Sequence, residues 1–295
     1  MPRRRHALPT LVAACTAALI GCGPSSESED LEPAVASFGQ PIQGGYLDEI
    51  DKSVVGIIIL SGGGYGGCTG TLIAPNVVLT AQHCVAETSS GGAVICDQTT
   101  FYAPFAPSDI LVHTETSTPM VPSLFTQAAE IVLPPGDGSF CGNDQAILIL
   151  AEPIDGAVAA PVVPRVDVPL ATGEIYSAVG YGQLYDSPQA PSGTRYRRDG
   201  LTVMCVGESC SYELSATALE WGGETGICSG DSGGPAIDSV GRVTGVASRG
   251  GFDCSYPTYG HVFSWGQWIK DTTAYAAGLI GTDPPAWTTG WPTDP

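Results

Sequence analysis

Basic residues are scarce in this chain: 11 Lys and Arg stand against 30 Asp and Glu, which gives a formal net charge of −19. Three of the basic residues are Arg3, Arg4 and Arg5, at the extreme N-terminus. Binding to nucleic acid requires basic patches that neutralise phosphates, so this balance argues against a nucleic-acid partner. The remaining basic cluster, Arg195-Tyr196-Arg197-Arg198, is too short to change this, and we expect it in an exposed loop or at a strand edge.

The chain also lacks a long apolar run. The apolar stretch from Ala7 to Ile20 follows the N-terminal arginines and is too short to form a stable membrane anchor. It ends in Leu-Ile-Gly-Cys22, which resembles the signal of bacterial lipoproteins, in which the chain is cut before a lipid-modified cysteine. We therefore predict a signal peptide over residues 1–22, with lipidation at Cys22; the alternative is ordinary signal cleavage. Acyl chains on Cys22 would be the protein's only attachment to a membrane.

Motifs that ligate zinc are absent, because no C-x-x-C pair occurs in the chain. We expect neither a metal nor a cofactor, and we expect a monomer. Of the ten cysteines, Cys15 lies in the signal and Cys22 is the lipidation site. The other eight are an even number in a chain predicted to be exported to an oxidising compartment, which predicts four disulfides.

Helical periodicity is almost absent, and short apolar runs alternate with turns after an acidic linker or propeptide over residues 23–41. This pattern predicts a β-barrel or a β-sandwich. The expected strands are Val54–Leu60, Thr69–Ile73, Val77–Ala81, Ile110–Val112, Glu130–Leu133, Ala146–Leu150, Ile175–Gly180, Leu201–Val206, Tyr212–Leu214, Arg242–Ser248 and Tyr259–Phe263. One helix is expected over 264–279, followed by an irregular tail over 282–295.

The hexamer Gly-Asp-Ser232-Gly-Gly-Pro places a serine among small residues. Backbone N–H groups can converge there on a developing oxyanion, although the same residue types also form plain surface turns. A nucleophilic serine needs a base, and histidine has a suitable pKa. His6 lies in the signal, and His113 and His261 have strand-like surroundings that favour structural roles, which leaves His83 after the apolar run Val-Val-Leu.

Three motifs, C-T-G-T-L-I…L-T-A-Q-H-C, N-D-Q-A-I-L-I-L and C-S-G-D-S-G-G-P, occur in that order and resemble the trypsin/chymotrypsin family of serine proteases. The resemblance covers residues 42–278, and we take residues 42–281 as the protease domain. It implies an all-β fold of two packed six-stranded antiparallel β-barrels with a C-terminal α-helix. His83 would come from the first barrel and Ser232 from the second, on either side of a cleft.

The resemblance also implies the rest of a catalytic triad. Asp144 matches the family's D-x-A-x-x-x-L pattern, which Asp109 and Asp155 lack. An aspartate in this role orients the imidazole and stabilises its protonated form. A lipase or esterase would carry its triad in the order Ser, Asp, His, whereas this chain has the order His, Asp, Ser. The expected activity is therefore that of a serine endopeptidase acting on proteins or peptides.

Further roles follow from the same resemblance. The N–H groups of Gly230 and Ser232 would form the oxyanion hole, Ser248 would flank the triad aspartate, and Tyr181 stands where the family more often has tryptophan. Cys68–Cys84 and Cys228–Cys254 correspond to disulfides of the family. Among the remaining four cysteines, proximity favours Cys205–Cys210, which leaves Cys96–Cys141, and this assignment is open.

The substrate residue before the scissile bond is expected to be uncharged. The resemblance implies that Gly226 occupies the position where an aspartate would select Arg or Lys, and that Gly250 leaves the pocket entrance open. We therefore predict a preference for small or medium apolar residues before the scissile bond. Arg249 replaces the family's usual aromatic residue; it either favours an acidic or polar upstream residue of the substrate or is simply solvated.

Activation in the family follows cleavage before a sequence such as Ile42-Gln-Gly-Gly. The new ammonium group of Ile42 would then pair with Asp231. Pro41 precedes the cut and no Lys or Arg lies between Arg5 and Lys52, so the activating protease would not be trypsin-like. The competing hypothesis for the whole chain is a latent or non-catalytic protease homologue that serves as a surface binding module.

Overall fold

The computed structural model describes residues 41–62, 64–90, 93–187, 189–210, 216–251 and 253–290, all of which belong to the compact unit Phe38–Pro295. The predicted signal peptide, Cys22, the linker up to residue 40 and the last five residues of the tail lie outside the described residues. Within the described ranges, no helix has the length and apolar character needed to cross a membrane.

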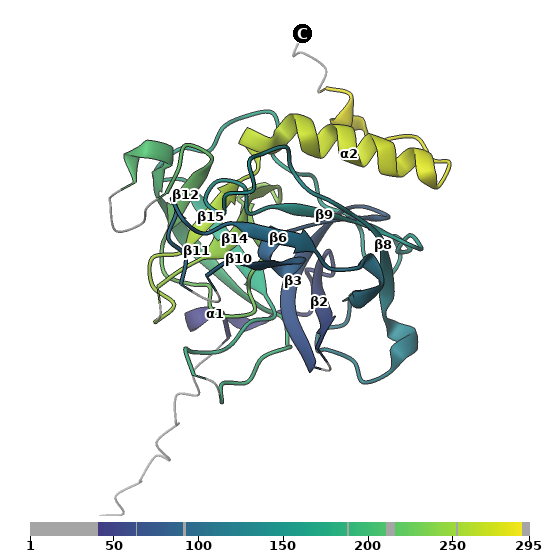
Figure 1. Cartoon of the computed structure of the whole chain (residues 1–295), viewed down its shortest axis with the longest axis horizontal. Helices are drawn as coiled ribbons and strands as arrows, with labels where there is room; N and C mark the ends of the chain where they lie inside the picture. The colour runs from purple at the N-terminus through teal and green to yellow at the C-terminus, as the bar shows by residue number, and fades with distance from the viewer. Residues whose placement is uncertain are drawn as a thin grey trace, which may run out of the picture. The chain divides into compact units, whose positions relative to one another are not determined.

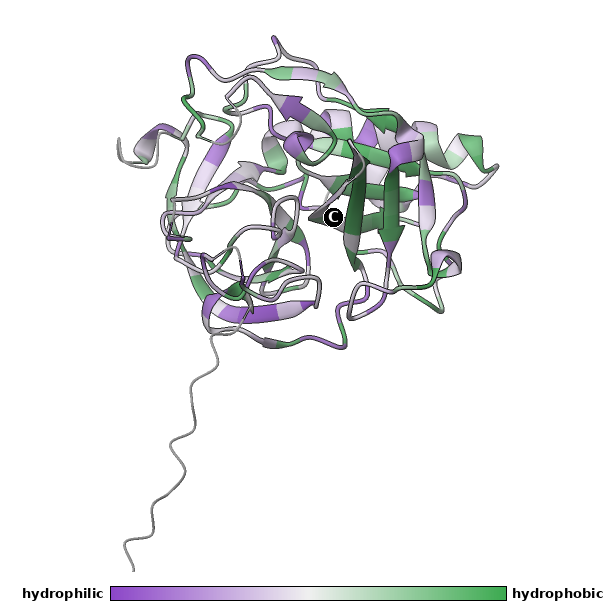
Figure 2. Ribbon diagram, turned by 60° about the horizontal axis from the view of Figure 1, so that its bottom comes forward, coloured by the Kyte–Doolittle hydropathy of each residue, from purple (hydrophilic) through white to green (hydrophobic). Residues whose placement is uncertain are grey.

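Six antiparallel strands close the first barrel in the order β2-β3-β4-β9-β8-β7 (Figure 1). These strands are β2 (Val54–Ser61), β3 (Gly64–Ala74), β4 (Val77–Thr80), β7 (Ile110–His113), β8 (Thr126–Val132) and β9 (Ala146–Leu150). Every residue of β4 and β9 is buried, which explains why β9 and the first three residues of β4 are apolar runs rather than alternating sequences. Figure 2 shows these hydrophobic strands as a block of green ribbon.

The second barrel has the strand order β11-β10-β13-β14-β15-β12, and the pairing of β11 with β12 closes it. Its strands are β10 (Ile175–Gly180), β11 (Tyr196–Val206), β12 (Glu220–Gly223), β13 (Pro235–Asp238), β14 (Val243–Arg249) and β15 (Thr258–His261). The short strand β1 (Tyr46–Leu47) adds to its edge by pairing with β11. The prediction of two six-stranded antiparallel barrels is confirmed.

Smaller elements complete the chain. They are α1 (Pro41–Gly44), η1 (Gln82–Cys84), β5 (Ala86–Thr88), β6 (Phe101–Pro104), η2 (Pro107–Asp109), η3 (Pro122–Leu124), η4 (Gly207–Ser209), η5 (Phe263–Trp265), α2 (Gly266–Leu279) and η6 (Ala286–Thr288). Helix α2 is the expected C-terminal helix and buries Ile269 completely. The tail is less irregular than predicted, because Trp287 in η6 is buried with the core residues of the first barrel. The expected strand Tyr212–Leu214 lies outside the described residues.

The expectation that Arg195 would be exposed is wrong. Its side chain is fully buried and forms an ion pair with the buried Asp48 at 3.0 Å. The guanidinium also donates to two carbonyls of the first barrel, those of Val54 at 3.1 Å and Thr114 at 3.3 Å. It donates as well to the hydroxyl of Tyr181 at 2.9 Å, and Tyr181 directly follows β10 of the second barrel. These partners offset part of the cost of burying the charge, while Nη2 has no hydrogen-bond partner among the described residues. Arg195 therefore links the two barrels.

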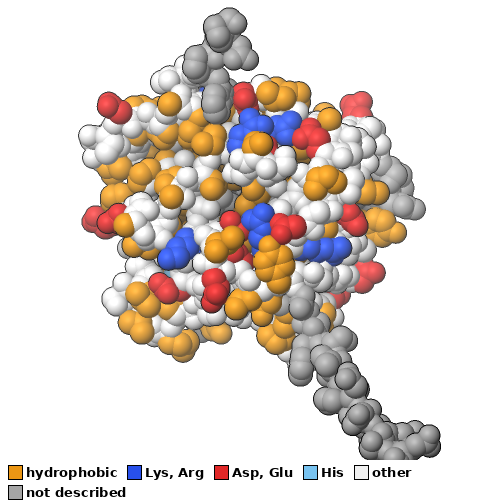
Figure 3. All heavy atoms as spheres, turned by 180° about the vertical axis from the view of Figure 1, so that it is seen from behind, with side chains coloured by type: hydrophobic (Ala, Val, Ile, Leu, Met, Phe, Trp, Pro, Cys, Tyr) orange, Lys and Arg blue, Asp and Glu red, His pale blue; other side chains and the backbone are white. Residues whose placement is uncertain are grey.

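Other arginines of the chain also form ion pairs. Arg197 pairs with Asp51 at 2.5 Å and with Asp199 at 2.6 Å. Arg242 pairs with Asp238 at 3.1 Å. Figure 3 shows basic side chains lying beside acidic ones on one face of the molecule, so this face does not present the continuous basic surface that a nucleic acid would require.

Candidate active site

His83 and Asp144 lie next to each other in the first barrel. His83 sits in the turn η1 directly after β4, and Asp144 precedes β9, which pairs with β4. The Nδ1 atom of His83 is 2.8 Å from Oδ2 of Asp144, and the backbone N–H of His83 donates to Oδ1 at 2.9 Å. The carboxylate thus holds both the ring and the backbone of the histidine, which fixes the direction of the imidazole.

The electrostatic surroundings favour the protonated form of His83. Burial lowers the pKa of the imidazole, but the negative charge of Asp144 and the hydrogen bond to it outweigh this effect, and the net pKa lies above its usual value. An imidazole that accepts a proton readily and keeps its ring fixed is suited to general-base chemistry. The histidine stays accessible, because 23% of its side chain is exposed, against 1% for Asp144.

Ser232 lies in the turn between β12 and β13 and lines the same cleft as His83. Thr69 of β3 braces this turn from the first barrel. Its backbone N–H donates to the carbonyl of Ser232 at 2.8 Å, and its hydroxyl donates to the carbonyl of Gly230 at 2.9 Å. The same hydroxyl accepts the N–H of Tyr181 at 3.0 Å. A first-barrel threonine therefore positions the serine of the second barrel.

Two backbone N–H groups beside Ser232 are available to an incoming oxygen. Gly230 has a φ of 95°, a left-handed conformation that favours glycine, and a Cβ there would lie 2.9 Å from the Cα of Gly182. The N–H groups of Asp231, Gly233 and Gly234 all donate to backbone carbonyls. Among the described residues, the N–H groups of Gly230 and Ser232 have no such partner. They are the pair that was predicted to form an oxyanion hole.

Asp231 is fully buried next to the candidate nucleophile. Its carboxylate accepts the N–H of Gly182 at 2.8 Å and the N–H of Cys228 at 2.8 Å. Burial outweighs these two hydrogen bonds and raises the pKa of Asp231 to about 7. Ile42 is likewise fully buried, among the core residues of the second barrel, although its backbone is still joined to Pro41. The predicted pairing of its ammonium group with Asp231 applies only after a cut at this bond.

The cleft between the barrels has a volume of about 1050 Å³. Its lining includes the predicted pocket residues Ser248 and Gly250, together with Ile227, Cys228, Cys254, Tyr256 and Thr258. Gly226 is buried, and a Cβ at this position would lie 2.9 Å from Cδ1 of Leu201. The neighbouring Ile227 reaches the cleft, where it contributes an apolar side chain.

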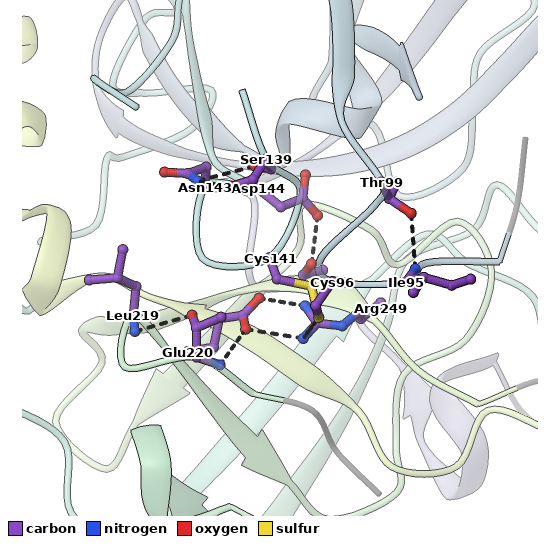
Figure 4. Close-up of a disulfide and its surroundings, with 12 residues drawn as sticks. Ile95, Cys96, Thr99, Ser139, Cys141, Asn143, Asp144, Leu219, Glu220 and Arg249 are labelled. Atoms are coloured by element: carbon purple, nitrogen blue, oxygen red, sulfur yellow. Dashed lines mark hydrogen bonds and ion pairs between the residues drawn. A yellow bond between two sulfur atoms is a disulfide. The ribbon is translucent and has the colours of Figure 1, made fainter. Parts of the chain in front are cut away.

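Ser248 and Arg249 end strand β14 at the edge of the cleft. The hydroxyl of Ser248 donates to Oδ2 of Asp144 at 2.6 Å, so the second barrel holds the acid of the first. Arg249 is not simply solvated: its guanidinium forms a two-nitrogen ion pair with the buried carboxylate of Glu220, with Nη2 3.0 Å from Oε2 (Figure 4). Its Nη2 also lies 3.8 Å from Sγ of Cys96.

The eight cysteines of the folded unit form four disulfides. The pairs are Cys68–Cys84, Cys96–Cys141, Cys205–Cys210 and Cys228–Cys254, the same pairs that the sequence favoured. Cys68, His83 and Cys84 lie close enough together to suggest a metal site. Because both cysteines belong to one disulfide, they offer no thiolate to a metal ion.

The other candidate histidines have structural surroundings. His113 is buried in β7 against Phe125 and Tyr181, and burial lowers its pKa to about 4. His261 in β15 accepts the N–H of Leu170 at 3.3 Å, and burial again lowers the pKa to about 4. Of the alternative aspartates, Asp155 accepts the N–H of Ala157, two residues further along its own loop, at 2.9 Å.

Sequence reasoning assigned no role to three residues of this site. Thr69 belongs to a quoted motif, but its bonds to the serine turn cross between barrels and have no local signal. Phe140 stacks on the ring of His83, with ring centroids 5.9 Å apart. It lies in none of the motifs that the sequence analysis singled out. Glu220 begins β12, where it pairs with Arg249, 29 positions away. Only the closed barrel brings these groups together.

The chain has two antiparallel barrels that share a cleft. One barrel contributes a histidine–aspartate pair and the other a serine turn, and this arrangement defines the chymotrypsin-like fold. The family model described as "Trypsin" matches residues 43–269. The chain belongs to the trypsin family of serine proteases.

Relatives and solved structures resemble the chain at moderate to low identity. Mouse kallikrein 1-related peptidase b24 is 28% identical over 227 residues, covering 70% of this chain and 80% of the relative. Human kallikrein-2 is 28% identical over 228 residues, covering 72% of this chain and 82% of the relative. A solved structure of an inactivated protease paralogue from the scabies mite has a TM-score of 0.59 at 20% identity, covering 78% of this chain and 98% of the other. This last likeness concerns the fold alone.

Proposed function

We propose that this protein is an active serine endopeptidase that cleaves peptide bonds through an acyl-enzyme. The observation that carries the proposal is the hydrogen-bonded set at Asp144: the carboxylate contacts His83 Nδ1 at 2.8 Å and accepts the hydroxyl of Ser248 at 2.6 Å, beside a cleft that Ser232 also lines.

In the proposed reaction, Oγ of Ser232 attacks the substrate carbonyl while Nε2 of His83 takes the hydroxyl proton. Asp144 stabilises the imidazolium that results and keeps Nδ1 protonated. The N–H groups of Gly230 and Ser232 donate to the oxyanion of the tetrahedral intermediate. His83 then gives its proton to the leaving amine, and a water molecule repeats the sequence to release the acyl group from Ser232.

The proposed specificity is for neutral side chains before the scissile bond. Ile227 gives the cleft an apolar side chain, and the position of Gly226 carries no charge. A peptide library should therefore show cleavage after small or medium apolar residues. Dominant cleavage after Arg or Lys would contradict this part of the proposal.

Maturation is proposed to include export, with attachment through Cys22, and cleavage between Pro41 and Ile42 by another protease. Four disulfides suit an oxidising compartment outside the cytoplasm. Cleavage would also release the protease domain from its lipid anchor. N-terminal sequencing of the active form should give Ile42; an active enzyme with an intact upstream segment would refute this activation step.

The direct test of activity is labelling by a fluorophosphonate, which reacts with an activated serine. The protein cut before Ile42 should be labelled, and the same form of Ser232→Ala should lose the label while retaining the circular dichroism spectrum and thermal transition of the wild type. An exposed serine away from the cleft provides the control, and Ser209→Ala should label normally. A folded protein cut at Ile42 that does not label would instead support the latent or non-catalytic homologue.

A further inference from the structure

Arg198 is the arginine of the basic run 195–198 that has no acidic partner. Arg195 and Arg197 pair with aspartates, whereas Arg198 forms no ion pair among the described residues. Its side chain is partly buried on β11, opposite Ala178 of β10. Although a chain with a net charge of −19 offers many carboxylates, this cation donates to backbone carbonyls instead.

The two carbonyls belong to segments that are far apart in the sequence. Nη1 of Arg198 donates to the carbonyl of Gln43 at 2.5 Å and to the carbonyl of Thr225 at 2.8 Å. Gln43 is the second residue after the proposed cut and lies in α1, which contacts β11 (Figure 1). Thr225 precedes the predicted pocket residue Gly226. One nitrogen therefore joins the segment that becomes the N-terminus to the pocket loop.

The backbone of this first segment turns beside the guanidinium. The N–H of Gly45 donates to the carbonyl of Ile42 at 2.6 Å, and Gly44 has a φ of 78°, a left-handed conformation that favours glycine. A Cβ on Gly44 would lie 3.6 Å from Nη1 of Arg198, so the guanidinium packs against the turn. Ile42 itself is fully buried in the core of the second barrel, and we call this its docked position.

The same segment also contacts a second loop of the cleft. The side-chain amide of Gln43 donates to the carbonyl of Asp253 at 3.2 Å. Asp253 precedes Cys254, and the disulfide between Cys254 and Cys228 contributes both of its residues to the cleft lining. The place of the segment that follows the cut and the shape of the pocket are therefore connected through bonds on two sides.

We propose that Arg198 is a positioning residue that holds the segment Ile42–Gly45 in its docked position and couples it to the pocket loop at Thr225. This inference rests on the proposed maturation at Ile42 and deepens it. Arg198 does not line the cleft, so it acts on the reaction only through the two carbonyls. Hydrogen bonds from a guanidinium are stronger than neutral ones, and the group keeps its charge at all pH values of interest.

The pH at which the segment undocks measures the strength of this hold. Only the protonated amino group of Ile42 pairs with Asp231, so docking raises the pKa of this group above its free value of about 7.7–8.0. Docking is then fully present below the free pKa and is lost as the pH rises through the docked pKa. While the docked form predominates at neutral pH, each tenfold loss in docking lowers this alkaline midpoint by about one pH unit.

Other charged and titratable groups around the segment leave this pH range free. Burial raises the pKa of Tyr176 on β10 and of Tyr259 on β15 well above the ordinary tyrosine value. The carboxylate of Glu224 already accepts an N–H of β11 at 3.1 Å. His83 limits activity on the acid side of the profile. A reversible alkaline loss of activity is therefore assigned to the amino group of Ile42.

The test compares Arg198→Met with the wild type after both proteins are cut before Ile42. Methionine keeps an apolar stem and removes the donor to both carbonyls. Each charged hydrogen bond contributes about tenfold or more to an equilibrium, so the alkaline midpoint of ester hydrolysis should fall by about one pH unit or more. The lost activity should return on adjustment to neutral pH. Equal midpoints in the variant and the wild type would overturn the inference.

The matched control is Arg197→Met. This variant removes a neighbouring arginine of the same strand, together with its ion pairs to Asp51 and Asp199, but no bond to the segment Ile42–Gly45. It should keep the wild-type midpoint even if its thermal stability falls. An equal fall of the midpoint in both variants would indicate a general loosening of β11 and would overturn the assignment to Arg198.

A second measurement does not depend on catalysis. Cyanate carbamylates accessible neutral amines, so the docked amino group of Ile42 should react slowly in the wild type. Arg198→Met should react about tenfold faster at this group, as measured by mass spectrometry of the N-terminal peptide. Lys52 and Lys270 are the two lysines of the chain and provide an internal reference. Equal rates at Ile42 would contradict the proposed hold.

Failure of the proposed function and failure of this inference give different results. A cut protein without ester hydrolysis, but with Arg198-dependent protection of Ile42 from cyanate, would refute the peptidase activity and support this inference. Ester hydrolysis with equal midpoints and equal carbamylation rates would overturn the inference alone. An active enzyme whose N-terminus is not Ile42 would refute the maturation step and this inference with it.

Should Arg198→Met fail to fold, Arg198→Lys keeps the proposal testable. Lysine retains the positive charge, but its side chain ends one atom short of Nη1 and lacks the planar guanidinium, so at least one of the two bonds is lost. The alkaline midpoint should fall in the same direction, and Ile42 should be carbamylated faster than in the wild type. A wild-type midpoint together with a wild-type rate would overturn the inference.

Discussion

The hydroxyl of Ser248 donates a hydrogen bond to Oδ2 of Asp144 at 2.6 Å, the same oxygen that lies 2.8 Å from Nδ1 of His83. One carboxylate oxygen therefore joins strand β14 of the second barrel to the histidine of the first. Because the serine and the histidine share this oxygen, the direction of the imidazole depends on the packing of the two barrels against each other.

Ser248→Ala should lower kcat without preventing folding. A hydrogen bond to a charged group contributes about 1.5–3 kcal/mol, so the expected loss is roughly tenfold to hundredfold if the bond supports only the active geometry. Steady-state kinetics with an ester substrate measures it. The control is Ser177→Ala, whose hydroxyl bonds to the exposed Asp199 at 2.5 Å, and it should retain full activity. Wild-type kcat in Ser248→Ala would contradict the role given to this bond.

The pH profile should report the raised pKa of His83. The base is the neutral imidazole, so kcat/KM should rise with pH and level off above an inflection that lies higher than the usual histidine value of 6.5. In Asp144→Asn the charge that raises the pKa is gone, so any residual activity should show a lower inflection, with kcat reduced by about 10⁴-fold. An unchanged inflection in Asp144→Asn would argue against the pairing.

Asp231 should make the continuous chain less stable at higher pH. Its folded pKa of about 7 exceeds the ordinary aspartate value of 3.8, so the folded state binds the proton more tightly than the unfolded state does. This contribution is fully present below pH 4 and is lost as the pH rises through about 7. Denaturant unfolding of the uncut chain at pH 5 and pH 8 should show the fall, which should be smaller in Asp231→Asn. A cut before Ile42 should also reduce it, because an ammonium partner favours the ionised carboxylate.

Gly182→Ala should damage both stability and activity. A Cβ at this position would lie 2.5 Å from Cγ of Asp231 and 2.6 Å from its backbone nitrogen, so the serine turn would have to shift. We expect a loss of about 1–3 kcal/mol or more in the free energy of unfolding, as in other overpacked cores, and little remaining activity. Gly278→Ala in α2 meets no atom within 4 Å and should be neutral or slightly stabilising. Thermal unfolding and ester hydrolysis of both variants test this.

Many of the strands and the motif residues follow from the sequence because their signals are local, whereas the two-barrel arrangement was predicted only from the family resemblance. Short apolar runs such as those of β4 and β9 are recognisable without a partner, and His83, Asp144 and Ser232 each lie in a characteristic motif. Strand β12 was not predicted because its sequence, Glu-Trp-Gly-Gly, has neither an apolar run nor alternation. Its four residues are nevertheless all buried, since β11 and β15 flank them.

Interactions between distant segments could not be predicted. Arg249 was expected either to favour an acidic or polar residue of the substrate or to be solvated. Its partner Glu220 lies 29 positions away in the chain and comes close because β15 lies between β12 and β14. Arg195 was expected to be exposed because arginine usually is. Its burial requires an acidic partner and three hydrogen-bond acceptors, which come from four separate segments of the chain. A buried arginine of this kind can therefore be identified only from the folded structure.

The contacts of Arg195 have a consequence for how the molecule comes apart. Detaching the first barrel would take away the carbonyls of Val54 and Thr114 and leave a guanidinium with unfilled hydrogen bonds at an apolar surface. Such a half-dissociated species would be higher in free energy than either end state. The two barrels, which look like separate modules in a topology diagram, should therefore melt together in a single cooperative transition, and neither is expected to persist as an isolated fragment.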